Sequence, residues 1–320
     1  MVGNLLKAEN LSRHFRLAGP WGRGPLLKAV EGVNLSVQAG ETLGLVGESG
    51  CGKSTLGRLL LALLPPTGGR VFFGGEELTK LPKSHLKHLR RQMQIVFQDP
   101  YSSLNPRLTV RQILEEPYAI HGLGGRLERR AWAAELLREV GLADEHLERY
   151  PHEFSGGQRQ RLGIARALAL KPRLIVADEP VSALDVSIQA QILNLLADLQ
   201  QRHGLTYLFI SHDLSVISQI SDRVAVMYLG RLVETAPRRV FDGARLHPYT
   251  EALLAAVPLP DPERPFKPPE LKGDPPSPIN IPSGCPFHPR CPEAQLPLCR
   301  DVVPDYRETA VEHWVACHLR

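Results

Sequence analysis

A chain of 320 residues, 43% hydrophobic and 22% charged, is long and apolar enough for one large core with an appendage, or for two domains. A formal net charge of +4 is too small to predict nucleic-acid binding. No apolar run approaches the roughly 18 residues of a membrane-spanning helix, and the first residues lack the pattern of a signal peptide. We therefore expect a chain that is not exported, without a disulfide framework, that meets a membrane only from its surface.

Short runs of aliphatic and β-branched residues predict strands, and helical patterns separate several of them. The predicted strands are Thr42–Val46, Val71–Phe73, Gln94–Phe97, Leu174–Ala177, Thr206–Ile210 and Arg223–Met227. This alternation predicts an α/β domain with a largely parallel sheet. Between about residues 100 and 170, Trp132, Leu136, Leu137 and Val140 recur at helical spacing, which predicts a helical insertion. Beyond about Pro258 the chain holds roughly half of its 28 prolines, so we expect an extended segment there.

A glycine-rich loop follows the first predicted strand and precedes a predicted helix that begins near Lys53. Its sequence fits G-x-x-x-x-G-K-[ST] in the strand–loop–helix context of a phosphate loop. The glycines let backbone N–H groups point at phosphate oxygens, Lys53 can reach the β- and γ-phosphates, and the Ser54 hydroxyl can ligate Mg²⁺. We expect ATP to contact this segment, whose residues are Gly47, Glu48, Ser49, Gly50, Cys51, Gly52, Lys53, Ser54 and Thr55.

The predicted strand Leu174–Ala177 ends in two acids, Asp178 and Glu179. The carboxyl ends of parallel strands meet at one edge of a sheet, so we expect these acids beside the phosphate loop. Asp178 can hold Mg²⁺, and Glu179 can polarise an attacking water as a general base.

Between these two motifs lies SGGQ, made of Ser155, Gly156, Gly157 and Gln158. Together the three motifs resemble the ATP-binding cassette (ABC) ATPases over nearly all of residues 5–240. The resemblance implies a P-loop NTPase core with a mixed, largely parallel sheet, a helical subdomain and ATPase activity. It also implies that SGGQ is the signature that closes over ATP held by a second subunit. Ser155 should open a helix through Ala169 whose exposed N–H groups form an anion site.

The same resemblance assigns roles to further residues. Gln98 would touch Mg²⁺ and the attacking water, His212 would contact the γ-phosphate, and Phe15 would stack on adenine. The loop that crosses the dimer interface would be Ser182, Ala183, Leu184 and Asp185. Taken alone, His212 could cap the following helix, Gln98 could be a surface residue, and Phe15 could belong to the core. Phe154 stands where the family usually has leucine before SGGQ.

Two further segments, FQDPYSSLNPRLTV (residues 97–110) and HPYTEALLAAVP (residues 247–258), together with the Cys- and Pro-rich C-terminal extension, resemble the ATPase subunits of bacterial dipeptide and oligopeptide importers. Nickel importers are relatives. The resemblance implies an ATPase domain over residues 1–257, with the helical subdomain at about 100–170, and an extension over 258–320. It implies a paralogue or a second copy as head-to-tail partner, two permeases, an extracytoplasmic binding protein, and a place on the cytoplasmic face of the plasma membrane. A soluble, non-transport cassette and a non-hydrolysing regulatory subunit remain alternatives.

Four of the five cysteines, Cys285, Cys291, Cys299 and Cys317, gather near the C-terminus. Thiols in a proline-stiffened segment suggest a soft-metal site, but the spacing lacks the paired C-x-x-C of zinc ribbons. The family resemblance favours a [4Fe–4S] cluster with a structural role. Zinc, with a histidine among His288, His313 and His318 as a substitute ligand, and reduced structural thiols are the alternatives.

Overall fold

The computed structural model describes residues 3–19, 24–243, 245–257 and 273–320. The chain divides into two compact units. Unit 1 comprises Met1–Gln38, Thr42–Lys80 and Ile210–Arg320, and unit 2 comprises Ala39–Glu41 and Leu81–Phe209. The boundary on the C-terminal side falls inside one strand, β8 (Thr206–Ser211).

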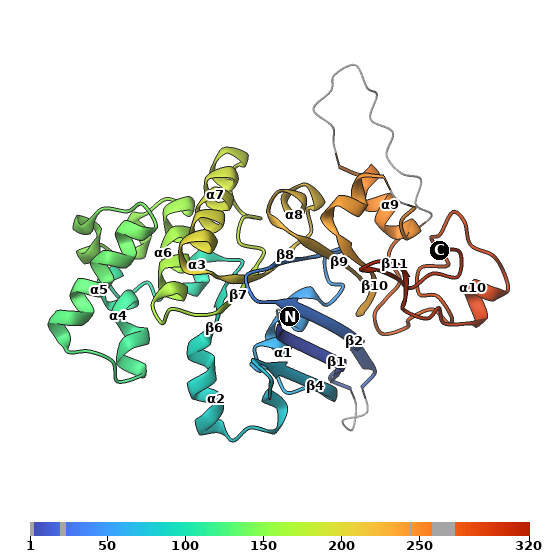
Figure 1. Ribbon diagram of the computed structural model, residues 1–320, viewed down its shortest axis with the longest axis horizontal. Coiled ribbons are helices and arrows are strands. Elements are labelled where there is room, and N and C mark those ends of the chain that lie inside the picture. Colours follow the sequence, from blue (N-terminus) through green and yellow to red (C-terminus); the bar gives the residue numbers. More distant parts are fainter. Residues whose placement is uncertain (1–2, 20–23, 244, 258–272) are drawn as a thin grey trace, which may run out of the picture. The chain divides into compact units, whose positions relative to one another are not determined.

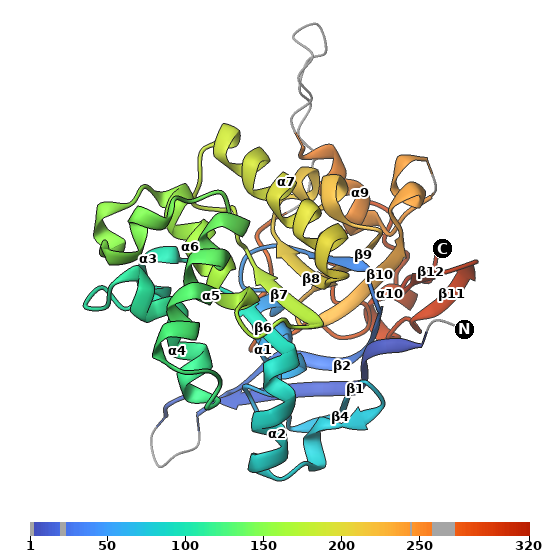
Figure 2. The same cartoon turned by 60° about the vertical axis from the view of Figure 1, so that its left-hand side comes forward.

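Unit 1 contains an antiparallel sheet in the order β2-β1-β4-β5, of which β1, β2 and β4 are seen side by side in Figure 2. Its strands are β1 (Asn4–Arg16), β2 (Leu26–Gln38), β4 (Gly68–Phe73) and β5 (Glu76–Glu77). The sequence did not predict β1 and β2. Their pairing shifts register repeatedly, as between Ala8 and Leu11, so their buried positions do not keep the period of two that marks a half-buried strand.

The other strands of unit 1 follow one another in the order β11-β12-β10-β9-β3. They are β3 (Thr42–Val46), β9 (Arg223–Tyr228), β10 (Arg231–Pro237), β11 (Arg307–Ala310) and β12 (His313–Val315). β3 and β9 are parallel, and the remaining pairs are antiparallel. Every residue of β3 is buried, as its unbroken apolar run predicted. The helices of unit 1 are α1 (Lys53–Leu60), α8 (Leu214–Ile220), α9 (Pro248–Ala255) and α10 (Leu298–Asp301).

Residues 273–320 fold into unit 1, so the expectation of an extended segment is wrong for this part of the chain. β12 pairs with β10, which places Val315 opposite Glu234. The Phe287 side chain is buried between the rings of Tyr228 and Tyr249, with centroid distances of 5.3 and 5.4 Å. The prolines are accommodated because short turns and one helical turn separate the paired segments. The part of the predicted extension at residues 258–272 lies outside the described residues.

In unit 2, β6 (Met93–Val96) and β7 (Leu174–Asp178) pair in parallel. The chain between them is largely helical, as the residue spacing predicted. Figure 1 shows α4, α5 and α6 as neighbours, and the Tyr118 and Trp132 rings join α4 to α5 with centroids 4.9 Å apart. The helices of unit 2 are α2 (Lys83–Leu89), α3 (Pro100–Ser103), α4 (Val110–Ile120), α5 (Arg126–Glu139), α6 (Gly156–Leu168) and α7 (Val186–His203).

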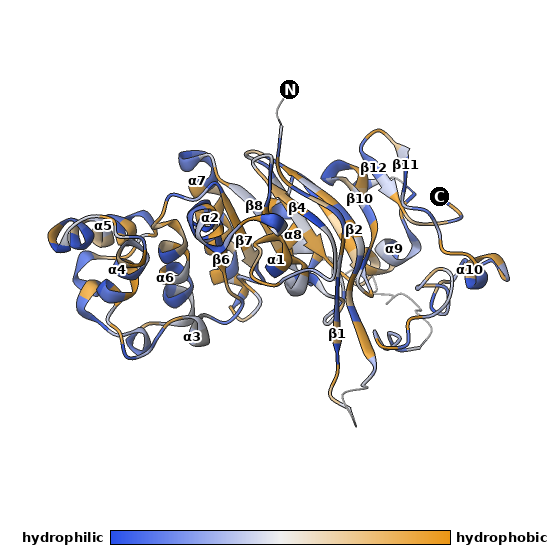
Figure 3. Cartoon of the chain, turned by 90° about the horizontal axis from the view of Figure 1, so that it is seen from below, coloured by the Kyte–Doolittle hydropathy of each residue, from blue (hydrophilic) through white to orange (hydrophobic). Residues whose placement is uncertain are grey.

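Hydropathy is distributed as packed elements require. Strand β7 is apolar along most of its length, whereas α5 carries polar and apolar residues around its circumference (Figure 3). In the part of the chain that the structure describes, no helix is both long enough and apolar enough to cross a bilayer.

A buried polar cluster ties three elements of unit 1 together. His247 is the N-cap of α9, where its Nδ1 accepts a hydrogen bond of 3.0 Å from the Tyr249 N–H. Glu234 of β10 accepts from the backbone N–H of His247 at 3.1 Å, and His313 of β12 contacts the other carboxylate oxygen at 2.7 Å. Burial, and next the charge of Arg320, lower the pKa of His247 to about 3, so its ring is neutral in the folded chain.

Because His247 has a lower pKa folded than unfolded, the unfolded chain binds the extra proton. The contribution of neutral His247 to the free energy of unfolding should be fully present above pH ~6.5. It should fall as the pH drops towards 3, by up to about 1.4 kcal/mol per pH unit. His247→Asn keeps a cap acceptor but cannot titrate there. Urea unfolding at pH 7 and pH 5 should show a smaller loss for His247→Asn than for the wild type. Equal losses would contradict this account.

Candidate nucleotide site

The phosphate loop of unit 1 runs from the end of β3 to the start of α1, as predicted. Gly52 has a φ of +108°, and a Cβ there would lie 2.1 Å from the Ala29 carbonyl oxygen. A Cβ on Gly47 would lie 2.1 Å from the Met227 carbonyl oxygen. Backbone of β2 and β9 therefore lies against the loop, and only glycine fits at these two positions.

Lys53 is the first residue of α1, and its side chain extends across the phosphate loop. Its side chain is buried, and its ammonium donates to the carbonyl oxygens of Gly47 at 2.7 Å and Glu48 at 3.0 Å. Gly52 caps α1 without a side-chain hydrogen bond, so the helix presents backbone N–H groups at its start. A positive ammonium beside a helix N-terminus is the arrangement that binds phosphate.

Two residues far along the chain hold Glu48, and no sequence motif indicates either of them. The Glu48 carboxylate accepts two hydrogen bonds of 3.0 Å from Arg290, and its backbone N–H donates to the Tyr249 hydroxyl at 2.9 Å. Both partners stand in segments on which the importer resemblance rests. These are HPYTEALLAAVP (residues 247–258) and the cysteine-rich segment, which runs from Cys285 to Cys317. The resemblance carried no information about what those segments contact.

Unit 2 carries the predicted acids at the end of β7. Asp178 is buried, and Glu179 has a φ of +47°, an unusual conformation for a residue other than glycine. Gln98 follows β6 and donates from its Nε2 to the Glu179 carboxylate at 2.9 Å. Ser182 donates from its hydroxyl to the Glu179 carbonyl oxygen at 3.1 Å. The backbone is thus held where the Glu179 side chain meets Gln98. Gln98 is exposed, as the surface alternative has it, and it is also hydrogen-bonded to Glu179.

The signature segment starts α6 as expected. Ser155 is the N-cap: its hydroxyl accepts from the Gln158 N–H, and the Gln158 side chain accepts from the Ser155 N–H at 3.1 Å, which forms a capping box. Phe154, the departure from leucine, is buried with its ring edge-on to His146 at a centroid distance of 5.3 Å. A Cβ on Gly156 would lie 3.4 Å from Leu184, so the signature and the Ser182–Asp185 loop are packed together.

His212 and Phe15 belong to unit 1. His212 is exposed after β8, and the N-cap of α8 is Asp213, whose carboxylate accepts from the Ser215 N–H at 2.7 Å. The alternative that His212 caps this helix is therefore wrong. Phe15 is partly exposed near the end of β1, with the Arg13 guanidinium 4.6 Å from its ring centroid, so it is not an ordinary core residue. The predicted nucleotide contacts are thus divided between the units: the phosphate loop, Phe15 and His212 in unit 1, and Gln98, the acids and the signature in unit 2.

The four C-terminal cysteines lie within electrostatic range of one another. Burial raises the pKa of Cys285 to about 11, and the charges of Cys317, Cys291 and Cys299 add to the shift. Among the described residues, no three Cys, His, Asp or Glu side chains converge as ligands of a single metal ion. The three candidate histidines are engaged elsewhere, because His313 contacts Glu234, His288 the Cys285 carbonyl oxygen and His318 the Val302 carbonyl oxygen.

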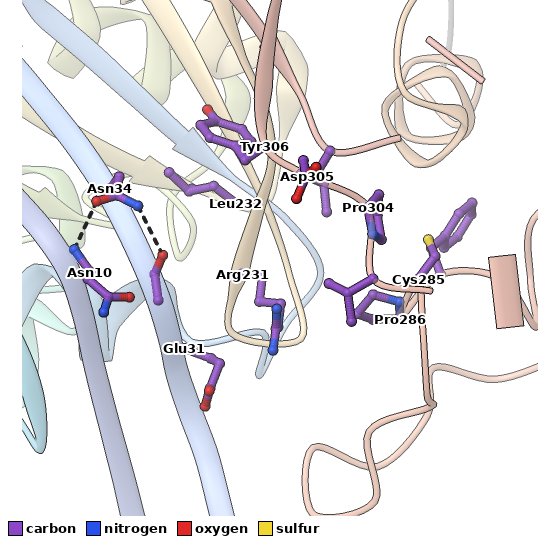
Figure 4. Close-up of a pocket in the computed structure, with 15 residues that line it drawn as sticks. Asn10, Glu31, Asn34, Arg231, Leu232, Cys285, Pro286, Pro304, Asp305 and Tyr306 are labelled. Carbon is purple, nitrogen blue, oxygen red and sulfur yellow. Dashed lines mark hydrogen bonds between the residues drawn. The ribbon is translucent and has the colours of Figure 1, made fainter. Parts of the chain in front are cut away.

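Cys285 also lines a cavity of about 340 Å³ inside unit 1. Figure 4 shows Cys285, Pro286 and Pro304 on the side of the C-terminal segment. Asn10 and Asn34 of the antiparallel sheet lie on the other side, joined by a hydrogen bond of 2.9 Å from the Asn10 N–H to the Asn34 side-chain oxygen. The cysteine-rich segment therefore lines a cavity of unit 1, the unit that also contains the phosphate loop.

Comparison with known proteins identifies the family. Residues 30–182 match the family described as ABC transporter, and residues 233–299 match the family described as oligopeptide/dipeptide transporter, C-terminal region. The chain is 57% identical over its full length to the "Probable peptide ABC transporter ATP-binding protein y4tS" of Sinorhizobium fredii, and covers 91% of that protein. It is 55% identical, over 92% of its length and 90% of the relative, to the "Oligopeptide transport ATP-binding protein AppF" of Bacillus subtilis. The chain belongs to the ABC transporter ATP-binding proteins.

Solved ABC structures share its fold. The dimeric ATP-binding cassette MJ0796, bound to ADP and Pi, has a TM-score of 0.65 and 31% identity, over 73% of this chain and 99% of that one. The protein cbiO1 from Clostridium perfringens has a TM-score of 0.64 and 29% identity, over 75% and 91% of the two chains. The predicted ABC ATPase fold is confirmed, and this ABC protein is an ATPase coupled to transport; the findings do not favour the soluble, non-transport cassette.

Two glycines of α6, the signature helix, differ in whether a larger side chain would fit in their place. A Cβ on Gly157 would lie 2.5 Å from Cγ2 of Ile188 on α7, whereas a Cβ on Gly163 would meet no atom within 4 Å. Alanine is the better helix former at both positions, so any loss must come from the contact. We expect Gly157→Ala to lower the free energy of unfolding by about 1–3 kcal/mol, and Gly163→Ala to raise it by up to about 1 kcal/mol.

Urea denaturation of both variants tests this expectation. In an Ile188→Ala background, which removes the atom that the new Cβ would meet, Gly157→Ala should cost less. The same cost in both backgrounds would show that the contact is not what requires glycine at position 157.

Proposed function

We propose that this ABC ATPase hydrolyses ATP to power the import of dipeptides or oligopeptides, as the peripheral subunit on the cytoplasmic face of a membrane transporter. The observation that carries the proposal is the match of residues 233–299 to the C-terminal region of oligopeptide/dipeptide transporters. The relatives' names, peptide and oligopeptide ATP-binding proteins, support it. Nickel or another small solute is the second candidate cargo, and the relatives do not favour it.

The partners follow from the same proposal. A second ATPase subunit, a paralogue or another copy, would pair head to tail so that Ser155–Gln158 closes over its nucleotide. The loop Ser182–Asp185 would cross that interface. Two permeases would form the membrane path, and an extracytoplasmic binding protein would deliver the solute to them. The dimeric MJ0796 cassette supports the pairing.

The residues of the two units suit the steps of ATP hydrolysis. Lys53 and the N–H groups of the loop and of α1 would bind the β- and γ-phosphates, Phe15 would stack on adenine, and His212 would contact the γ-phosphate. Glu179 would accept a proton from the attacking water while the water oxygen bonds to the γ-phosphorus. The bond between the γ-phosphorus and the bridging β-phosphate oxygen would break, and ADP would leave. Gln98, already hydrogen-bonded to Glu179, would orient that water.

Each residue expected to bind Mg²⁺ carries a type of donor that suits this ion. The Ser54 hydroxyl, the Asp178 carboxylate, in part through water, and the amide oxygen of Gln98 are the hard oxygen ligands that this ion prefers. Gln98 bonds Glu179 through its amide nitrogen, which leaves the oxygen as its ligand atom. Bound there, Mg²⁺ would neutralise charge on the phosphate oxygens.

We expect Glu179→Gln to bind ATP and to trap the closed dimer, because the amide keeps the shape of the carboxylate but cannot accept the proton. ATP turnover should fall by about two to four orders of magnitude, and uptake of labelled dipeptide by cells that depend on this subunit should fall to background. The measurements are phosphate release, size-exclusion chromatography with ATP, and peptide uptake.

Gly163→Ala, on the buried face of α6 away from the signature, serves as the control and should retain turnover. Normal turnover in Glu179→Gln would remove Glu179 from the catalytic role and support the non-hydrolysing alternative. Loss of nickel uptake with peptide uptake intact would replace the proposed cargo.

For the C-terminal thiols we propose a [4Fe–4S] cluster rather than zinc. Burial raises the pKa values of Cys285 and Cys291, and Cys299 and Cys317 contribute to both shifts, so the four thiols lie near one another, as a shared cluster requires. The cysteine spacing lacks the paired C-x-x-C of common zinc ribbons, which disfavours zinc. A bound cluster would supply the positive charge that allows four neighbouring thiols to ionise together, and would cross-link the segment.

Protein purified without oxygen should contain about four irons and four sulfides per chain. Cys291→Ser should lower both contents, whereas Cys51→Ser, at the cysteine of the phosphate loop, should leave them unchanged. Stoichiometric zinc without iron would select the zinc alternative. Absence of both metals from protein purified in this way would leave the thiols as reduced structural residues.

A further inference from the structure

The phosphate loop is attached to the cysteine-rich segment through a charged pair, Glu48 and Arg290. The two guanidinium nitrogens Nη1 and Nη2 of Arg290 donate to the two carboxylate oxygens of Glu48, each at 3.0 Å. The Arg290 side chain is only 7% exposed and that of Glu48 is 26% exposed, so water screens the pair weakly. A paired, two-bond contact of this kind fixes direction as well as distance.

A second contact reaches the same residue from α9. The Tyr249 hydroxyl accepts the backbone N–H of Glu48 at 2.9 Å, and the Tyr249 ring is completely buried. Tyr249 packs against Tyr228 and Phe287 at centroid distances of 4.7 and 5.4 Å. Phe287 in turn accepts, through its carbonyl oxygen, the backbone N–H of Arg290 at 3.0 Å. The two contacts on Glu48 are therefore parts of one packed structure.

The charge of Glu48 makes this attachment consequential for nucleotide binding. Glu48 is the first residue after Gly47 in the loop, so its carboxylate lies in the segment that must hold the negative phosphates. An unpaired carboxylate there would repel the phosphates and would be free to turn, whereas Arg290 both neutralises it and holds it. Lys53 bonds to the Glu48 carbonyl oxygen, so displacement of Glu48 would also disturb the phosphate-binding ammonium.

We propose that Arg290 and Tyr249 are positioning residues for the phosphate loop, through which the cysteine-rich segment and bound ATP stabilise one another. The proposal rests on the ATPase function of this loop. Arg290 immediately precedes Cys291, so whatever fixes the cysteines also fixes the guanidinium. Coupling between two sites is reciprocal: ATP at the loop then favours the folded form of residues 285–299.

The test compares ATP binding by the purified chain. Arg290→Gln leaves the Glu48 charge unpaired, so the ATP Kd and KM rise about tenfold. Because Glu179 and Gln98 are untouched, kcat at saturating ATP stays within about twofold of the wild type. Adding Glu48→Gln removes the unpaired charge, so the double variant binds ATP more tightly than Arg290→Gln alone. Arg300→Gln is the matched control, since Arg300 is an exposed arginine of the same segment and its side chain bonds to Asp301.

Tyr249→Phe keeps the buried ring and removes only the hydroxyl. It raises the ATP Kd about threefold and carries the test if Arg290→Gln does not fold. Hydrogen exchange of the amides of residues 285–299 slows on addition of ATP in the wild type and does not slow in Arg290→Gln.

Three results would overturn the proposal: an ATP Kd within twofold of the wild type in folded Arg290→Gln or in Tyr249→Phe, a double variant weaker than Arg290→Gln, or exchange at residues 285–299 that ATP does not change. Wild-type protein that binds no ATP would instead refute the function of the loop itself, so the two failures are distinguishable.

Discussion

The phosphate loop keeps its shape because every polar group of Glu48 is held. Its N–H meets the Tyr249 hydroxyl, its carboxylate meets Arg290, and its carbonyl oxygen meets the Lys53 ammonium. The glycines on either side can adopt the required backbone but cannot fix it, since a glycine has no side chain to anchor. The anchors come from α9 and from the cysteine-rich segment, so the C-terminal third of the chain belongs to the structure that binds phosphate.

The residues that we propose for the catalytic chemistry lie in the other unit. Glu179, held at a positive φ by the Ser182 contact to its carbonyl oxygen, meets Gln98 from the end of β6. Leu184 packs toward Gly156 at the start of the signature helix. Within unit 2, Glu179 and Gln98, the proposed general base and water-orienting residue, are thus linked to the proposed signature through the loop Ser182–Asp185. If the signature helix shifted when it bound a partner's nucleotide, the loop Ser182–Asp185 after β7 would therefore move with it. Contacts of this kind are what a cycle of dimer closure and opening requires.

Much of the site could be predicted from the sequence because its chemistry depends on residues adjacent in the chain. The phosphate loop, the strand ending in Asp178 and Glu179, and the capped signature helix are each contained in a short segment. The contact between Glu48 and Arg290 spans 242 residues, and no local pattern indicates which distant arginine meets a loop carboxylate. β1 and β2 were missed because their bulges disturb the apolar period. The proline-rich end was expected to be extended because proline disfavours regular elements, yet turns and buried rings such as Phe287 fold residues 273–320 into unit 1.

The central claim is that this ABC ATPase is one half of the motor of a peptide importer. The most direct test is to purify it in its native complex from membranes, and to measure ATP hydrolysis with and without peptide-loaded binding protein. The account predicts that a second ATPase subunit and two permeases purify with it, and that peptide stimulates hydrolysis. Recovery without permeases, or an ATPase activity that peptide does not change, would contradict it.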